Sequence, residues 1–141
     1  MANSSTATSN QSIMNLNQPS QISFTFAATV KLDRSNFLLW RKQVLTSIKG
    51  NRLEKFISEP QIVPEQYLSN AITDGSGENV ENPAYVNWRA LDQTLLGWLL
   101  STISEGIRSS VLSYDTSFDV WKSIDKLEFN IKLRSCNFVM K

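Results

Sequence analysis

The strongest structural signal in this sequence is a long helix that begins at Asn82-Pro83. Asparagine caps the first turn of a helix, and proline at the first helical position loses no intrahelical hydrogen bond. Apolar side chains then recur at spacings of three and four residues from Tyr85 to Ile103, which is about five turns. Further leucines widen this stripe. The sequence therefore predicts a central helix that is covered on more than one side.

A second helical pattern precedes the central one. Ser35 or Asn36 can cap a helix over residues 37–50, whose apolar side chains repeat with helical spacing. A short apolar patch follows at residues 53–57, and prolines interrupt any long helix after it. We expect residues 58–83 to form an irregular surface segment.

Two more helical patterns follow the central helix. Ser104 can cap a short helix that carries Ile107, Val111 and Leu112 and ends near residues 113–115. Thr116 with Asp119 resembles a capping box with the shorter acid in place of glutamate. Apolar residues keep helical spacing behind that box as far as Ile131, whereas the last ten residues keep no clean period. The sequence thus predicts an all-α fold, a compact bundle of four to five helices.

The N-terminal part of the chain has a different character. Residues 1–20 are rich in Ser, Thr, Asn and Gln and carry no charged side chain, which predicts a disordered polar arm. Residues 22–30 alternate between apolar and polar side chains, the period of a strand with one covered face. A single strand is not stable alone, so this segment either pairs in a hairpin or lies across the helices as a short extended arm.

The predicted hydrophobic core joins three of the helices. The four tryptophans fall on three predicted helices, at apolar positions of their stripes. This distribution indicates one shared core. The core residues that we expect are Phe37, Trp40, Val44, Trp88, Leu95, Trp98, Leu99 and Trp121.

The composition excludes several kinds of catalytic and metal site. The chain has no histidine, and Cys136 is its single cysteine. A Ser-His-Asp or Cys-His nucleophile, a His-based metal site, a zinc finger and an internal disulfide are therefore excluded. No glycine-rich phosphate loop occurs, and acids such as Glu78 and Glu81 lie in a polar stretch with nothing to desolvate them. We expect no enzyme activity, no cofactor, no metal and no small-molecule substrate.

No targeting or membrane segment is recognisable. The first ten residues carry no cationic side chain and no apolar region of a signal peptide. The longest strongly apolar run, Thr94–Ser101, is far shorter than the roughly 18 to 20 residues that span a bilayer. The sequence predicts an intracellular, cytoplasmic protein without a membrane partner.

Charge is balanced overall but not along the chain. The formal net charge is +1, yet residues 31–56 carry seven basic side chains against two acidic ones, and residues 59–92 carry six acidic ones against one basic. Such a bipolar arrangement can favour head-to-tail association between copies. It can equally be intramolecular complementarity or solvated surface.

The basic segment 41–55 is also a candidate nucleic-acid surface. The net charge of +1 is low for a dedicated nucleic-acid-binding domain, so we expect RNA binding to be weak. The basic side chains of this segment are Arg41, Lys42, Lys49, Arg52 and Lys55.

Several stretches, taken in order, resemble a known family. Residues 30–40 read VKLDRSNFLLW, residues 82–88 read NPAYVNW, residues 92–104 read DQTLLGWLLSTIS and residues 117–121 read SFDVW. In this register, residues 21–128 resemble the N-terminal Gag domain of copia-type, plant-type retrotransposons. That resemblance implies an α-helical part of the capsid that self-associates with other Gag copies into virus-like particles packaging the element's RNA.

The C-terminal residues depart from the family pattern. Residues 129–141 match the usual continuation poorly, and the zinc knuckle of a complete Gag is absent. We therefore expect a truncated extension there, and weak RNA packaging without the knuckle. Two alternatives remain open: a non-functional or domesticated fragment of a retrotransposon polyprotein, and a weak nucleic-acid-binding module built on residues 41–55.

Overall fold

The computed structural model describes residues 24–26, 30–68 and 79–139, and most of this part of the chain is helical. Within these ranges, extended backbone pairs only at two isolated β-bridges. The predicted all-α bundle of four to five helices is confirmed, whereas the predicted disorder of residues 1–20 lies outside the described residues. The helices are α1 (Phe37–Gly50), α2 (Lys55–Ser58), α3 (Pro83–Ser101), α4 (Glu105–Arg108) and α5 (Ser117–Val139).

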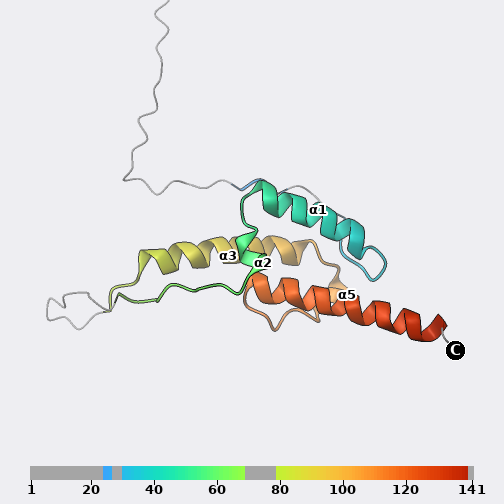
Figure 1. Cartoon of the computed structure of the whole chain (residues 1–141). Coiled ribbons are helices and arrows are strands. Elements are labelled where there is room, and N and C mark those ends of the chain that lie inside the picture. Colours follow the sequence, from blue (N-terminus) through green and yellow to red (C-terminus); the bar gives the residue numbers. More distant parts are fainter. Residues whose placement is uncertain (1–23, 27–29, 69–78, 140–141) are drawn as a thin grey trace, which may run out of the picture.

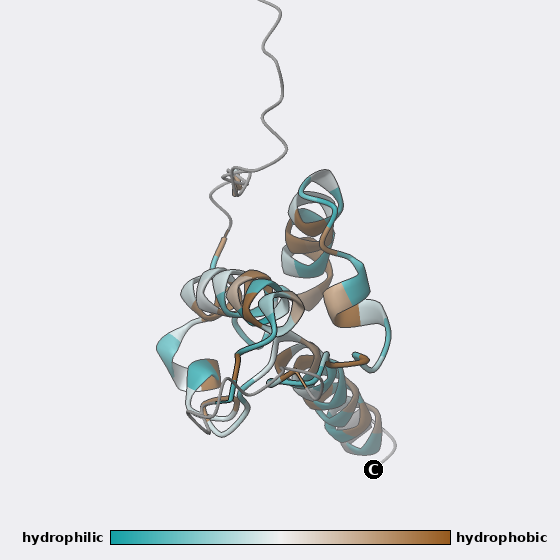
Figure 2. Cartoon of the chain, turned by 90° about the vertical axis from the view of Figure 1, so that its left-hand side faces the viewer, coloured by the Kyte–Doolittle hydropathy of each residue, from teal (hydrophilic) through white to brown (hydrophobic). Residues whose placement is uncertain are grey.

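The three long helices surround the hydrophobic core. Helix α1 lies along one side of the pair formed by α3 and α5, and α5 contacts both α2 and α3 (Figure 1). The C-terminal end of α5 extends beyond the other helices (Figure 1). Each long helix carries hydrophobic and hydrophilic residues together, as Figure 2 shows. This is the amphipathic pattern of helices that bury one face against their neighbours.

Trp40 lies at the centre of the core and is fully buried. Its ring stacks on that of Trp121 in α5, with 5.7 Å between the ring centroids. Its Nε1–H points at Thr102, where both the backbone oxygen and Oγ1 lie at 3.1 Å. Thr102 directly follows α3, so the Trp40 side chain connects its own helix, α1, to both α3 and α5.

Two of the expected core tryptophans lie at the edge of the core instead. Trp88 and Trp98 are only partly buried against it. Trp88 borders a pocket beside α2, and Trp98 stacks on Phe26 of the N-terminal arm. Helical spacing predicts which side chains lie on the apolar stripe of a helix, but it does not predict which of them lie at the centre of the core and which at its edge. The other expected core residues are buried: Phe37, Trp40, Val44, Leu95, Leu99 and Trp121.

The marginal position of Trp98 gives a stability prediction. We expect Trp98→Ala to lower the free energy of unfolding by about 2 kcal/mol, roughly half of what a fully buried tryptophan costs. Trp98→Phe, which keeps a ring for Phe26 to stack on, should cost about 1 kcal/mol. Urea unfolding followed by circular dichroism measures both. A loss from Trp98→Ala as large as that from removing Trp40 would contradict the edge position.

Two predicted helix caps form as expected. The Oδ1 atom of Asn82 accepts a hydrogen bond from the Ala84 N–H at 3.0 Å, at the start of α3. At the start of α5, Thr116 Oγ1 accepts from the Asp119 N–H at 3.2 Å and donates to the Asp119 carboxylate at 2.9 Å. Both caps connect residues two or three positions apart, so the local sequence determines them.

The start of α1 differs from the prediction, since the Asn36 side chain does not cap the helix. Its Oδ1 accepts instead from the Asp33 N–H at 2.8 Å, and Ser35 Oγ donates to the Asp33 carboxylate at 2.7 Å. The Ser35 hydroxyl and N–H stabilise the charged carboxylate and hold the pKa of Asp33 below its ordinary value. The stability that this turn contributes is therefore present at neutral pH and is lost as the pH falls through the lowered pKa.

The N-terminal arm follows one of the two alternatives that the sequence leaves open. Its described residues, 24–26 and 30–32, lie across the helices and form no hairpin with each other. Leu32 is fully buried; its N–H donates to the Thr102 oxygen at 2.8 Å, and its own oxygen accepts from the Ser104 N–H at 3.0 Å. The remaining residues of the expected strand lie outside the described residues.

Helix α5 is longer than its hydrophobic pattern predicts. Residues 132–139, which belong to the last ten residues and keep no clean period, continue the helix to Val139 without a break. No glycine or proline occurs between Ser117 and Val139, so nothing in the backbone chemistry ends the helix earlier.

Candidate interaction surfaces

Titratable side chains do not gather into a metal or catalytic site in the described part of the chain. No group of three or more His, Cys, Asp or Glu residues there could hold a metal ion. Cys136 is a free, exposed thiol on α5. Every helix of the described ranges is too short or too polar to cross a membrane.

Arg41 is not part of an open basic surface. Its guanidinium forms ion pairs with Asp125 and Glu128 of α5, and its central carbon lies 6.0 Å from the centroid of the Trp121 ring. Glu128 in turn accepts from Lys132, with 2.8 Å between Nζ and Oε1. Arg41 therefore connects α1 to α5, and we correct its assignment to an interaction surface.

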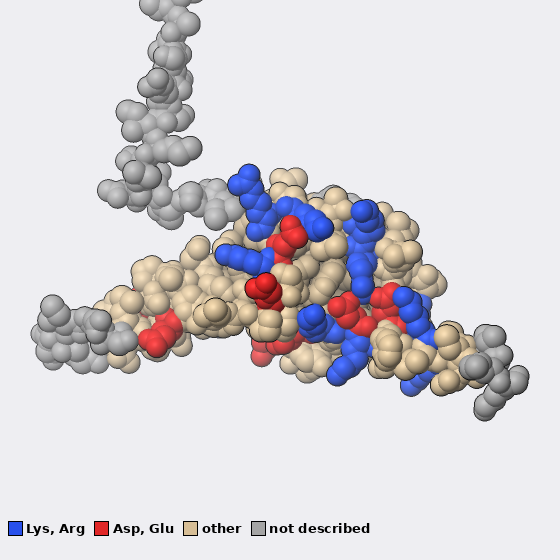
Figure 3. All heavy atoms as spheres, in the orientation of Figure 1, with Lys and Arg blue, Asp and Glu red and all other residues tan. Residues whose placement is uncertain are grey.

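The other four basic residues of the candidate surface do not form one patch. Lys42 and Lys49 are exposed and lie seven positions apart on the same outer face of α1. Arg52 follows that helix in a left-handed conformation with φ of 59°. Lys55 begins α2, with its Nζ 5.5 Å from the centroid of the Phe56 ring. On the face drawn in Figure 3, acidic side chains lie between the basic ones.

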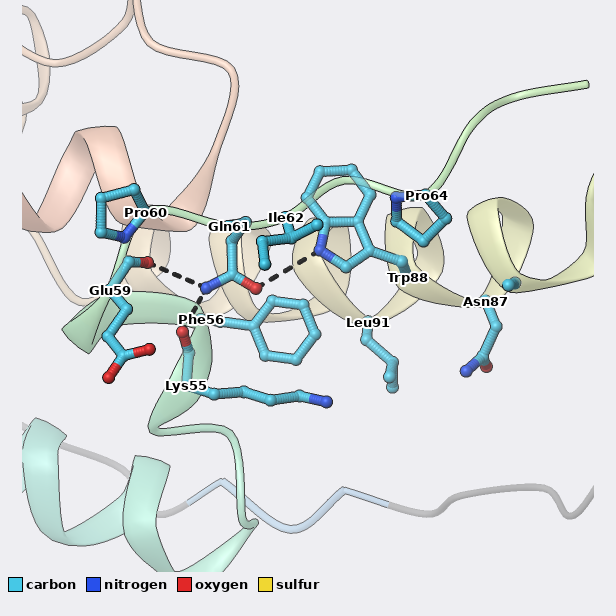
Figure 4. A pocket seen from close by; sticks show the side chains of 11 residues that line it. Lys55, Phe56, Glu59, Pro60, Gln61, Ile62, Pro64, Asn87, Trp88 and Leu91 are labelled. Atoms are coloured by element: carbon cyan, nitrogen blue, oxygen red, sulfur yellow. Dashed lines mark hydrogen bonds between the residues drawn. The ribbon is translucent and has the colours of Figure 1, made fainter.

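A pocket of about 440 Å³ lies between α2, the segment that follows it, and α3 (Figure 4). Phe56 and Trp88 are among its apolar lining residues. Gln61 lies between them: its Oε1 is 3.4 Å from Trp88 Nε1, and its Nε2 donates to the Glu59 oxygen at 3.0 Å. Lys55 and Glu59 also line the pocket, but their charged ends point in different directions (Figure 4). The pocket offers apolar surface without a paired acid and base.

The part of α5 beyond Glu128 carries exposed apolar side chains. We call residues 129–139 the α5 extension. Phe129 and Leu133 are 61% and 46% exposed, and their spacing of four residues places them on one face of the helix. Three neighbouring pairs are also exposed elsewhere: Leu38 with Leu39 at the start of α1, and Ile62 with Val63 and Tyr67 with Leu68 after α2.

The hydrophobic pattern of the sequence does not reveal the α5 extension as a surface. Its signal is faint, because Phe129 and Leu133 lie on the side of α5 opposite to the buried residues Val120 and Ile124. Two apolar stripes on opposite sides of one helix leave no single period to recognise.

Comparison with known proteins relates the chain to retrotransposon polyproteins. It is 25% identical over 115 residues to the "Retrovirus-related Pol polyprotein from transposon RE1" of Arabidopsis thaliana, and 26% identical over 121 residues to that from transposon RE2 of the same plant. The matches cover 82% and 86% of this chain but 8% and 7% of those polyproteins. No family model and no solved structure matches the chain. The chain is thus similar to one short segment of two retrotransposon polyproteins.

Proposed function

We propose that this chain is a non-enzymatic structural module that self-associates in the cytoplasm, comparable to the Gag capsid part of a copia-type retrotransposon. The observation that carries the proposal is the similarity to retrotransposon polyproteins over 82% and 86% of the chain. The order of its sequence blocks, which resembles that of the copia-type Gag N-terminal domain, supports the same proposal.

The α5 extension supports a role in association. At about 1.5 Å per residue it adds roughly 16 Å of helix beyond Glu128. Isolated helices of this length are marginal in water, so contact with a partner would stabilise the extension. Covering Phe129 and Leu133 would also remove apolar surface from water, at about 25 cal/mol per Å².

A second copy of this chain suits the α5 extension as a partner. In an antiparallel two-fold pairing, Phe129 of each copy can lie against Leu133 of the other, because the same patch serves both sides. Lys126 and Lys132 flank the apolar pair on the same face of the helix, and in this antiparallel register they lie opposite the uncharged Cys136 and Asn130 of the other copy. Ile131 of the extension packs against the chain's own core, whereas Phe129 and Leu133 are exposed.

Replacing the apolar pair on the extension tests this proposal. We expect Phe129→Ser/Leu133→Ser to weaken self-association at least about 100-fold, or about 2.7 kcal/mol, since the contact loses the burial of two apolar side chains in each copy. Size-exclusion chromatography with light scattering gives the molar mass at each concentration. Circular dichroism checks the fold, which should persist because both side chains are exposed.

A matched variant controls for the loss of exposed apolar side chains in general. Ile62→Ser/Val63→Ser removes a pair that is 96% and 48% exposed after α2 and should leave self-association unchanged. Equal effects of the two double variants would show that the α5 extension is not the contact.

The nucleic-acid-binding alternative has less support. Arg41 is engaged with α5, and the four remaining basic residues are spread over α1, the turn after it and α2. A few separated phosphate contacts predict weak binding that decreases with added salt.

A further inference from the structure

The described residues of the N-terminal arm occupy a slot between α1 and α3. Asn51, which follows α1, holds the backbone of Thr25 from both sides: its Oδ1 accepts from the Thr25 N–H at 3.1 Å, and its Nδ2 donates to the Thr25 oxygen at 3.0 Å. One carboxamide thus replaces the two hydrogen bonds that a neighbouring strand would provide. The Asn51 carboxamide therefore binds the backbone of residue 25, and these two hydrogen bonds do not depend on the side chain at that position.

Aromatic rings supply the second part of the slot. The Phe26 ring stacks on Trp98 of α3, with 4.5 Å between centroids and an angle of 14°. The Phe24 ring follows at 6.0 Å from Phe26. Both phenylalanines pack against the core, whereas Thr25 between them is exposed. The slot therefore fits an extended peptide of the pattern aromatic-x-aromatic.

The walls of the slot are held by the helices rather than by the arm. The Nδ2 of Asn51 also donates to the Ser47 oxygen at 2.8 Å, and the Asn51 N–H bonds to the same oxygen at 3.1 Å. Trp98 belongs to the long helix α3. The two recognition groups therefore belong to the helical part of the chain and not to the arm.

We propose that residues 24–26 of a second copy can take the place of the chain's own arm in this slot. This inference rests on the proposed self-association and adds a contact distinct from the α5 extension. An exchanged arm makes the same contacts as the original one, so exchange between nearby copies has a low cost. The donor arm leaves from Leu32, which stays bonded to Thr102 and Ser104 of its own chain.

The chain length limits the geometry of the exchange. Four peptide steps separate Phe26 from Val30, and they span at most about 14 Å. The slot of the second copy must therefore lie within this distance of the donor's Val30. Two copies that exchange arms must therefore be in direct contact, so the exchange would be part of a close-packed assembly.

A peptide titration tests whether the slot accepts an arm in trans. The full chain carrying Phe24→Ala/Phe26→Ala leaves its own slot empty, and a labelled peptide of residues 21–29 (QISFTFAAT) serves as the probe. We expect saturable binding by fluorescence anisotropy, weakened at least 10-fold in the unsubstituted chain, where the chain's own arm competes. Adding Asn51→Ala, or using a peptide with alanine at both phenylalanine positions, should also weaken it at least 10-fold. Absence of saturable binding, or binding that ignores Asn51→Ala, overturns the proposal.

Cross-linking intact chains tests the exchange without altering the aromatic residues. One copy carries Thr25→Cys and the other Gly50→Cys, both with Cys136→Ser, and a short bismaleimide is added. Gly50 directly precedes Asn51 and has open space for a side chain, so Asn51 itself stays intact. We expect cross-links between these copies, and at least 10-fold fewer when Lys42→Cys replaces Gly50→Cys. If copies associate by light scattering but positions 25 and 50 do not cross-link, the exchange is wrong and self-association stands. If the copies do not associate at all, both proposals fail.

Discussion

Trp40→Ala should lower the free energy of unfolding by about 4 kcal/mol, the usual cost of removing a fully buried tryptophan. Domains of this size are stable by only about 5 to 15 kcal/mol, so much of the variant should be unfolded under mild conditions. The loss is large because the Trp40 ring fills the space between three helices and donates to Thr102. The Thr102 oxygen that it bonds also accepts from Leu32 of the arm. Urea unfolding followed by tryptophan fluorescence measures the change.

Trp40→Phe separates packing from hydrogen bonding. The smaller ring keeps the contact with Trp121 but loses the bond to Thr102, so we expect a cost of about 2 kcal/mol. The same loss from Trp40→Phe and Trp40→Ala would show that the hydrogen bond dominates. A loss below about 1 kcal/mol from Trp40→Ala would contradict the central position of this ring.

Asp92→Ala should destabilise the fold by about 3 kcal/mol, although it removes a charged side chain from a hydrophobic surrounding. Asp92 is 1% exposed, and its Oδ1 accepts from the Ser117 N–H at 3.1 Å, at the first residue of α5. Ser117 Oγ donates back to the Asp92 backbone oxygen at 2.9 Å. A carboxylate at a helix N-terminus also interacts favourably with the helix dipole. Removing it leaves a buried N–H without its acceptor.

Asp92→Asn is the matched control for the charge. The amide keeps an oxygen that can accept from the Ser117 N–H, so we expect a cost of about 1 to 2 kcal/mol. Thermal unfolding of the two variants, side by side, gives the difference. Equal stability of Asp92→Ala and the unsubstituted chain would contradict the capping role.

Local signals predicted the helices well. The caps at Asn82 and Thr116 depend on residues two or three positions away, and the apolar stripe of α3 repeats within one helix. Asn36 shows the limit of such signals, because an asparagine before a helix can equally close the preceding turn, as it does here with Asp33. Asparagine is favoured both at a helix N-cap and in a turn, so its propensity does not decide which of the two roles Asn36 takes.

Contacts between distant segments account for what the sequence did not reveal. Arg41 looks like a member of a basic segment, but its partners lie 84 and 87 residues further along the chain. Asn51 looks like a helix stop, yet it also holds Thr25 at a separation of 26 residues. Asp92 interrupts an apolar stripe and caps a helix that begins 25 residues later. Each role depends on how the helices pack against one another, and the hydrophobic pattern of a single helix does not predict that packing.

The measurement that tests self-association most directly is sedimentation velocity of the full chain over a concentration series, at low and at moderate salt. We predict that larger species grow with concentration at both salt levels, because apolar contacts through Phe129 and Leu133 are not screened by ions. Growth at low salt alone would assign the contact to the bipolar charge pattern instead. A compact monomer at every concentration would contradict the proposed function and favour a fragment that does not assemble by itself.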